Sequence, residues 1–299
     1  MLEVLEKIGN QLDRNIFPSV KNGGIVVPNT NSDHSTTLGS GQHNERQRKR
    51  QTAPQWQELT RWWWDPQWQW ATQWRRSPYT APSVLSAGLK QKCEKDLILL
   101  SQAYPDTRSW REETGLWVLT ESALLPASLR KAIFLVGISF RWPFIVRGWG
   151  FWVDEFSGIP LWIGPRHTNF TDGSICAFEP SDETWTLRDP IVGLLDIYTL
   201  WAVRHLHLEF LGRWPGYQVA HHPYERILEI REDEYCGCGG SEQYKNCCQP
   251  RDLRRNRLTD AIDFRLMTGG CERKPPSVIS EFICGGKKPP CLDELLIVS

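Results

Sequence analysis

Apolar side chains recur at intervals of three and four residues in three segments of the chain. In residues 82–104 this pattern predicts a helix of about five turns. A second long helix is predicted after Asp189, which suits the N-cap, with Pro190 at the first helical position and Gly212 at the C-terminal stop. A short amphipathic helix is predicted within residues 1–17.

Four short apolar segments lie between the two long helices. They are separated by turn residues and read GLWVLTESALL, KAIFLVGISF, FIVRGWGFWVD and IPLWIG. Segments of this length and spacing predict an antiparallel meander. A loop with one cysteine then leads into the second long helix. The order of helix, four strands, loop and helix indicates an α+β fold.

Two segments near the N-terminus depart from these patterns. Residues 20–55 are rich in Ser, Asn, Gly, Thr and Gln, which predicts a flexible linker. Its basic run RQRKR is expected to be solvated, although it could also contact phosphate or an acidic partner. Residues 56–81 hold seven tryptophans, which either pack against their own domain, dock a partner or stack on bases.

Charge and hydropathy narrow the class of protein. The chain has 35 basic and 35 acidic residues, so binding of nucleic acid through bulk charge is not expected. An apolar run of the roughly 18 to 20 residues that span a bilayer is not found, nor is a signal-peptide pattern. We therefore expect a soluble, cytoplasmic protein whose nine cysteines are reduced. Clustered cysteines are then candidates for metal ligands or catalysts.

Cys176 stands near the end of the loop HTNFTDGSICAFEPSDETW. It is either a nucleophile or a small buried residue, and His167 could act as a general base in a Cys–His pair or could simply fix the loop. Three acidic residues surround the cysteine and either hold an incoming amine or are solvated: Asp172, Glu179 and Asp182.

The loop and its surroundings resemble the ubiquitin-conjugating-enzyme domain over residues 82–216. That family has His-Pro-Asn, then Gly-x-Ile-Cys, then a Trp and a helix. The matching positions here are His167, Thr168, Asn169, Gly173, Ser174, Ile175, Cys176 and Trp185. Thr168 replaces the proline, Asn169 is one residue nearer the cysteine, and the gap from cysteine to tryptophan is one residue longer.

The resemblance implies a catalytic role for three of these residues. Cys176 would attack the activated carboxyl end of a protein tail, and a lysine amine would then attack the thioester. The amide of Asn169 would stabilise the oxyanion by roughly 3 to 4 kcal/mol, or would shape the loop. His167 would fix the loop through hydrogen bonds.

A second motif, YCGCGGSEQYKNCC, carries four cysteines at C-x-C-x8-C-C spacing: Cys236, Cys238, Cys247 and Cys248. Four thiolates this close in sequence can close a tetrahedral zinc (Zn2+) site, although free reduced thiols are the alternative. The motif resembles the SEC-C zinc module, which is expected over residues 217–250. Tyr244 and Lys245 also match that module, and GGS stands where it usually has GSG. The zinc is expected to be structural, because all four ligands come from the protein.

The tail, residues 251–299, begins with a predicted basic amphipathic helix. Two similar elements follow, KPPSVISEFI and KPPCLDELLI. They either dock a partner or pack on the core, and packing is the preferred interpretation.

Stand-alone proteins of this conjugating-like kind occur in bacterial anti-phage operons, including cyclic-oligonucleotide (CBASS) systems. The resemblance therefore implies a transferase whose protein substrate is a cyclic-oligonucleotide synthase (a nucleotidyltransferase) or a ubiquitin-like protein. The sequence has no ATP-binding motif, so another protein would activate the acyl donor, or Cys176 would attack an existing amide. A non-catalytic adaptor and a cysteine hydrolase are the alternative functions.

The sequence predicts five segments along the chain. They are a helix and linker (1–55), a Trp-rich segment (56–81), a conjugating-like domain (82–216), a zinc module (217–250) and a tail (251–299).

Overall fold

The computed structural model describes most of the chain outside the region 27–85. The described residues are 2–21, 24–26, 86–123, 125, 130–141, 144–154, 158–170, 172–178, 184–293 and 295. The Trp-rich segment, most of the predicted linker, and the acidic residues Glu179 and Asp182 lie outside them. The described residues belong to one compact unit, with the bounds Met1–Asn29 and Leu85–Ser299. The described part is α+β, with seven α-helices and a five-stranded antiparallel sheet.

The N-terminal helix α1 (Leu2–Asp13) forms as its apolar spacing predicts. It buries Leu5, Ile8 and Leu12 and packs against the long helix α6 (Ile191–Leu211). A short hairpin follows, formed by β1 (Ser19–Lys21) and β2 (Gly24–Val26), where the linker was predicted to begin.

The two long predicted helices are α5 (Ala87–Ala103) and α6, and they pack against each other. Gly212 ends α6 in the left-handed conformation, as its C-terminal position predicts. The predicted N-cap was wrong: Pro190 occupies the cap position. The Asp189 carboxylate accepts instead from the backbone and side chain of Thr186, and Asp96 of α5 accepts from the first amide of α6.

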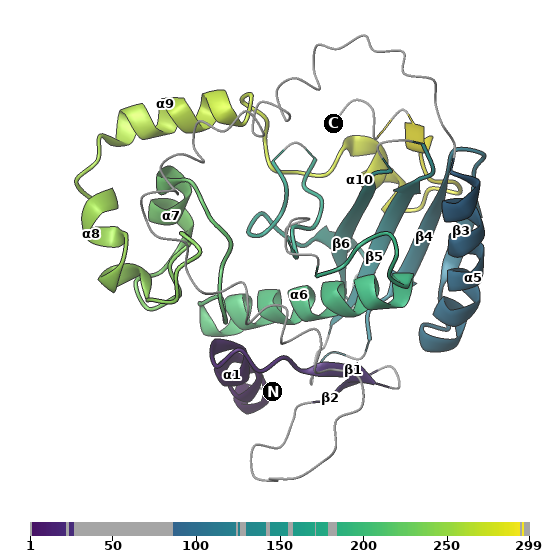
Figure 1. Ribbon diagram of the computed structural model, residues 1–299, viewed down its shortest axis with the longest axis horizontal. Helices are drawn as coiled ribbons and strands as arrows, with labels where there is room; N and C mark the ends of the chain where they lie inside the picture. The colour runs from purple at the N-terminus through teal and green to yellow at the C-terminus, as the bar shows by residue number, and fades with distance from the viewer. Residues whose placement is uncertain are drawn as a thin grey trace. The chain divides into compact units, whose positions relative to one another are not determined.

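The sheet is an antiparallel meander in sequence order (Figure 1). Its strands are β3 (Arg108–Arg111), β4 (Gly115–Glu121), β5 (Arg130–Ser139), β6 (Val146–Asp154) and β7 (Pro160–Trp162). Four of these five strands coincide with the predicted apolar segments. Strand β3 was missed because its sequence, RSWR, is mostly polar. Its one apolar residue, Trp110, makes an edge-on contact with Phe282.

The two faces of the sheet have different covers. Alternate residues of the strands, such as Val118 and Phe134, face α5 and α6 in the main core. The opposite face, which includes Trp117 and Trp149, is covered by the C-terminal tail. The tail contributes its helix α10 (Ser277–Ile283), as seen in Figure 1.

Both Pro-Pro elements take part in this cover. The first buries Ile279 and Phe282, and the second buries Leu292, while the indole of Trp117 donates to the carbonyl of Pro290 (3.1 Å). The preferred interpretation, that these elements pack on the core, is confirmed.

The residues between α6 and α10 form a small C-terminal module, which includes the first part of the predicted tail. It contains α7 (Pro223–Glu229), the 3-10 helix η2 (Tyr244–Asn246), α8 (Gln249–Asp252) and α9 (Arg257–Met267). The predicted basic helix is divided, because the side chain of Asn256 caps α9 by accepting from the amides of Leu258 and Thr259.

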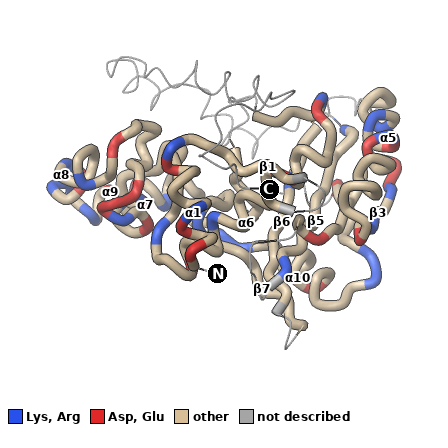
Figure 2. Tube along the Cα trace, turned by 90° about the horizontal axis from the view of Figure 1, so that it is seen from below, with Lys and Arg blue, Asp and Glu red and all other residues tan. Residues whose placement is uncertain are grey.

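Charge is mixed over the described elements. Figure 2 shows Lys and Arg interspersed with Asp and Glu along α5, α7, α8 and α9. None of the helices in this part of the chain is both long and apolar enough to cross a lipid bilayer.

Candidate functional site

Cys176 lies on the connection between β7 and α6, and two backbone hydrogen bonds hold it there. The amide of Cys176 donates to the carbonyl of His167 (3.0 Å), and the preceding amide, of Ile175, donates to the carbonyl of Gly148 on β6 (2.7 Å). Thr168 and Ile175 form an isolated antiparallel bridge. The cysteine is half-buried. A partly accessible thiol on a hydrogen-bonded backbone is compatible with a nucleophile.

His167 supports Cys176 through its backbone. Its φ of 51° is unusual for a residue other than glycine, and its carbonyl also accepts from the indole of Trp201 (3.0 Å). The imidazole stacks on Trp214 with ring centroids 4.0 Å apart, and it meets His221 edge-on. Burial lowers the pKa of His167 well below its usual range, with smaller contributions from His221 and Arg166. The ring is therefore neutral and belongs to the core.

Asn169 closes the turn that precedes Cys176. Its amide and carbonyl pair with the carbonyl of Ser174 (2.7 Å) and the amide of Gly173 (2.9 Å), and its side-chain Nδ2 donates to Oγ of Ser174 (2.9 Å). Of its two expected roles, this geometry matches the shaping of the loop.

Asp172 fits neither of its two expected roles. It is buried, so it is not a solvated loop acid, and its carboxylate is engaged within the protein. One oxygen accepts from the amide of Ser174 (2.9 Å), and the other lies 3.3 Å from Nε of Arg147. Glu179 and Asp182 lie outside the described residues.

Three tryptophans anchor the loop through their indole N–H groups. Trp149 donates to the carbonyl of Asp172 (2.8 Å), Trp162 to that of Gly173 (3.2 Å), and Trp185 to that of Pro190 (2.9 Å). Trp185 was singled out from the sequence. The other two were not, although their place on strands that precede the loop is a signal that could have found them.

The C-terminal tail also contacts the loop, which the sequence gave no reason to expect. Gly173 has a φ of 62°, and a Cβ at this position would lie 2.5 Å from the carbonyl carbon of Lys274. Arg273 donates to the carbonyl of Pro165 (3.1 Å) and lies over the ring of Phe170, 3.8 Å from its centroid. The tail is therefore part of the loop's support.

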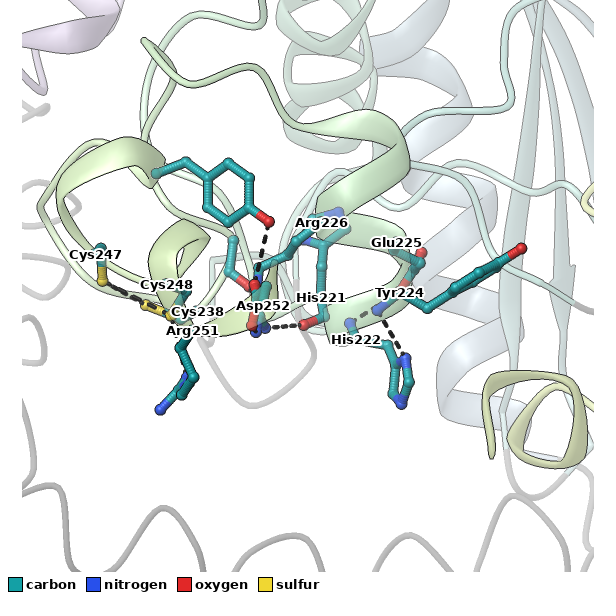
Figure 3. A network of polar contacts seen from close by, with 12 residues as sticks. His221, His222, Tyr224, Glu225, Arg226, Cys238, Cys247, Cys248, Arg251 and Asp252 are labelled. Carbon is teal, nitrogen blue, oxygen red and sulfur yellow. Dashed lines mark hydrogen bonds and ion pairs between the residues drawn. The ribbon is translucent and has the colours of Figure 1, made fainter. Parts of the chain in front are cut away.

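The four predicted ligands form one cluster in the C-terminal module. The sulfur atoms of Cys236, Cys238, Cys247 and Cys248 all lie within 4.8 Å of one another. The Cys238 and Cys247 sulfurs are 3.6 Å apart, and those of Cys247 and Cys248 are 3.8 Å apart (Figure 3). The cluster could therefore hold a metal ion, and four sulfur donors suit a tetrahedral zinc.

The electrostatics of the cluster favour a cation at its centre. Hydrogen bonds from its neighbours, Cys236 first, lower the pKa of Cys238 to about 2, and the matching interactions raise the pKa of Cys236. Burial, then the hydrogen bond to Cys238, raises the pKa of Cys247 to about 12. In the protein alone, these shifts favour the thiolate at Cys238 and the thiol at Cys236 and Cys247. A divalent cation would stabilise all four as thiolates.

A buried ion pair connects the cluster to α7. Arg226 binds both carboxylate oxygens of Asp252 (2.7 and 2.8 Å) and donates to the carbonyl of His221 (2.6 Å), as Figure 3 shows. The hydroxyl of Tyr244 also donates to Asp252 (3.2 Å). Apart from its cysteines, the module's own buried cluster contains only Ile230 and Tyr244. A core this small needs a metal or another constraint to be stable.

A second group of possible ligands has a cation already. His221, Glu225 and Glu229 place their ligand atoms within 4.8 Å of one another. Arg273, however, forms ion pairs with both glutamates, at 3.1 Å to Glu229. Its guanidinium supplies the positive charge that a metal would bring, so this group is a salt-bridge cluster.

Comparison with known proteins finds no matching family model, no matching curated protein and no matching solved structure. The function is therefore inferred from the two cysteine sites and the fold that positions them.

Proposed function

We propose that the chain is a ubiquitin-conjugating-like transferase that carries an acyl group on Cys176. The observation that carries this proposal is the position of the cysteine: a half-buried thiol, held by the carbonyl of His167, on the loop between an antiparallel meander and the helix α6. The order of helix, meander, cysteine loop and helix supports the resemblance to ubiquitin-conjugating enzymes.

The proposed reaction has two steps. The Cys176 thiolate attacks the activated C-terminal carbonyl of a protein tail, so that a C–S bond forms and the activating group leaves. A lysine amine then attacks the thioester, the C–N bond forms, the C–S bond breaks and the thiolate is restored, while the amine loses a proton to solvent. The proposed donor is a cyclic-oligonucleotide synthase or a ubiquitin-like protein, activated by another protein or attacked at an existing amide.

In this proposal Asn169 serves the reaction from its place in the turn. A side-chain amide carries two N–H groups, and one of them holds Ser174. In the proposal the other N–H stabilises the oxyanion that forms in each step.

Two other functions, a cysteine hydrolase and a non-catalytic adaptor, can each be weighed against the transferase by one observation. A cysteine hydrolase would use His167 as its general base, but a buried imidazole with a strongly lowered pKa is a poor base near neutral pH. A non-catalytic adaptor is the second candidate, and the exposed apolar residues of α9 favour it: Leu258, Ile262 and Leu266.

The test is intact-mass spectrometry of the protein expressed with a candidate donor, a cyclic-oligonucleotide synthase or a ubiquitin-like protein, together with an activating enzyme, and isolated under acidic, non-reducing conditions. The transferase predicts an added protein mass that hydroxylamine removes and that is absent from Cys176→Ala. Cys284→Ala, which changes an exposed cysteine of the tail, is the matched control and keeps the adduct. A stable complex that never forms an adduct would instead support the adaptor.

A further inference from the structure

A buried ion pair joins the Cys176 loop to the four-cysteine module. Arg166 precedes His167 in the chain, and its guanidinium forms two hydrogen bonds to the carboxylate of Glu234, one of them 3.0 Å long. It also donates to Oε1 of Gln218 (2.8 Å). Glu234 is fully buried and stands two residues before the cluster ligand Cys236. Two segments that are 68 residues apart in sequence are thus fastened at this point.

The same carboxylate fixes the residue on which His167 rests. Glu234 accepts from the amide of Trp214 (2.7 Å), and the indole of Trp214 stacks on the His167 ring. The carbonyl of Glu234 accepts from the amide of Tyr244, which lies inside the module (2.8 Å). A displacement of Glu234 would leave Arg166 as an unpaired buried charge, which is strongly destabilising.

A second connection runs through His221. Its ring meets His167 edge-on, with centroids 5.3 Å apart, and its amide donates to the carbonyl of Gly237 (2.8 Å). Gly237 lies between the possible ligands Cys236 and Cys238. The backbone that carries these two cysteines is therefore hydrogen-bonded to His221, whose ring contacts His167.

We propose that Arg166, His167 and Glu234 are positioning residues that make the geometry of Cys176 depend on a metal bound at the four-cysteine cluster. The module has little core of its own, so the metal sets its fold. Its fold places Glu234 and Gly237, these hold Arg166 and His167, and the carbonyl of His167 holds the amide of Cys176. The inference rests on the proposed function for its consequence in transfer, but it can be measured on the thiol alone.

The first experiment follows alkylation of Cys176 by iodoacetamide, resolved by mass spectrometry of the peptide that contains it. Chelation of the metal is expected to speed alkylation by about tenfold, because the loop loosens and exposes the half-buried sulfur. Adding Zn2+ back restores the slow rate. Complete release of the metal with an unchanged alkylation rate would overturn the proposal.

The second experiment keeps the metal and breaks the connection. Arg166→Met is expected to speed alkylation of Cys176 while metal content, measured by elemental analysis, stays the same, and Arg166→Lys recovers part of the wild-type rate. Arg255→Met is the matched control, because Arg255 pairs with Asp260 within the module and this pair does not involve the loop. If Arg166→Met and Arg255→Met change the alkylation rate equally, the effect reflects a general loss of stability, and the proposal is overturned.

The two proposals fail separately. Alkylation that depends on the metal, without any acyl adduct, would keep the positioning role and remove the transferase. An acyl adduct on Cys176, together with an alkylation rate that is the same with and without the metal, would support the transferase and overturn the positioning role.

Discussion

At the scale of residues, the carbonyl of His167 and the side chain of Asn169 do different work around Cys176. The carbonyl accepts from both Cys176 and Trp201, whereas the Asn169 amide closes the preceding turn on Ser174. One side-chain N–H of Asn169 holds Ser174, and the other is the proposed oxyanion donor, so substitutions can separate the two roles.

A comparison of two variants separates these roles. Asn169→Ala removes both the turn contact and the proposed oxyanion donor, and is expected to slow acyl transfer about 100-fold. Ser174→Ala removes only the turn contact and is expected to cause a much smaller loss. Single-turnover discharge of the adduct to free lysine is the measurement. Equal losses in the two variants would mean that Asn169 only shapes the loop.

The buried histidines predict how stability depends on pH. Burial is the main cause that lowers the pKa of His167 far below its usual range and that of His205 to about 3. In the unfolded chain both bind a proton near pH 6.5, so between that pH and the folded pKa values the unfolded state holds more protons. Stability is therefore expected to fall as the pH drops below about 6.5, by up to about 1.4 kcal/mol per pH unit for each histidine.

Urea unfolding of the wild type and of His205→Gln at pH 7, 6 and 5 measures this effect. The variant is expected to show a shallower loss, and the difference between the two curves isolates His205 from the other titrating groups. Parallel curves for the two proteins would contradict the assignment of a neutral buried His205.

At the scale of elements, apolar spacing predicted the helices α1, α5 and α6, and continuous apolar segments predicted four strands, of which β4, β5 and β6 are buried on both faces of the sheet. The sequence patterns missed β3, because RSWR is mostly polar, and they misplaced the N-cap of α6. The four-cysteine cluster could be predicted because all its ligands are neighbours in sequence. The pairs that hold the loop could not, since Arg166 and Glu234 are 68 residues apart and only the folded chain brings them together.

The contact between the loop and the tail can be tested at Gly173. Gly173→Ala must adopt a left-handed φ and place a Cβ against the backbone of Lys274 and Pro275. Gly158→Ala is the matched control, because Gly158 has a φ of 64° but nothing within 4 Å of the added Cβ. The control is expected to lose about 1 kcal/mol of unfolding free energy, from the backbone alone.

Gly173→Ala is expected to lose clearly more than this control, because the tail must move away from the loop. The unfolding free energy in urea is the measurement for both variants. Equal losses would show that the tail does not press on the loop at this position.

At the scale of the whole molecule, the residues that follow α6 contact two separate parts of the fold: the Cys176 loop and the sheet. The module carries the cysteine cluster and supports the Cys176 loop, and the tail that leaves it covers the sheet face opposite α6 (Figure 1). The chemistry of the loop and the stability of the module are therefore expected to depend on each other.

Metal content tests the module directly. The purified protein is expected to contain one zinc per chain, and Cys247→Ala is expected to lose it together with the stability of the module. Cys284→Ala, outside the cluster, keeps both. Elemental analysis and thermal unfolding are the measurements, and a metal-free wild type of undiminished stability would contradict a structural metal site.

The most direct test of the central claim, that Cys176 passes an acyl group from one protein to an amine, is a chase of the isolated adduct with lysine. The account predicts that the adduct mass disappears from Cys176 and that the tail appears joined to lysine through an amide, as read by mass spectrometry. Release of the tail as a free acid, or an adduct that maps to another residue, would contradict it.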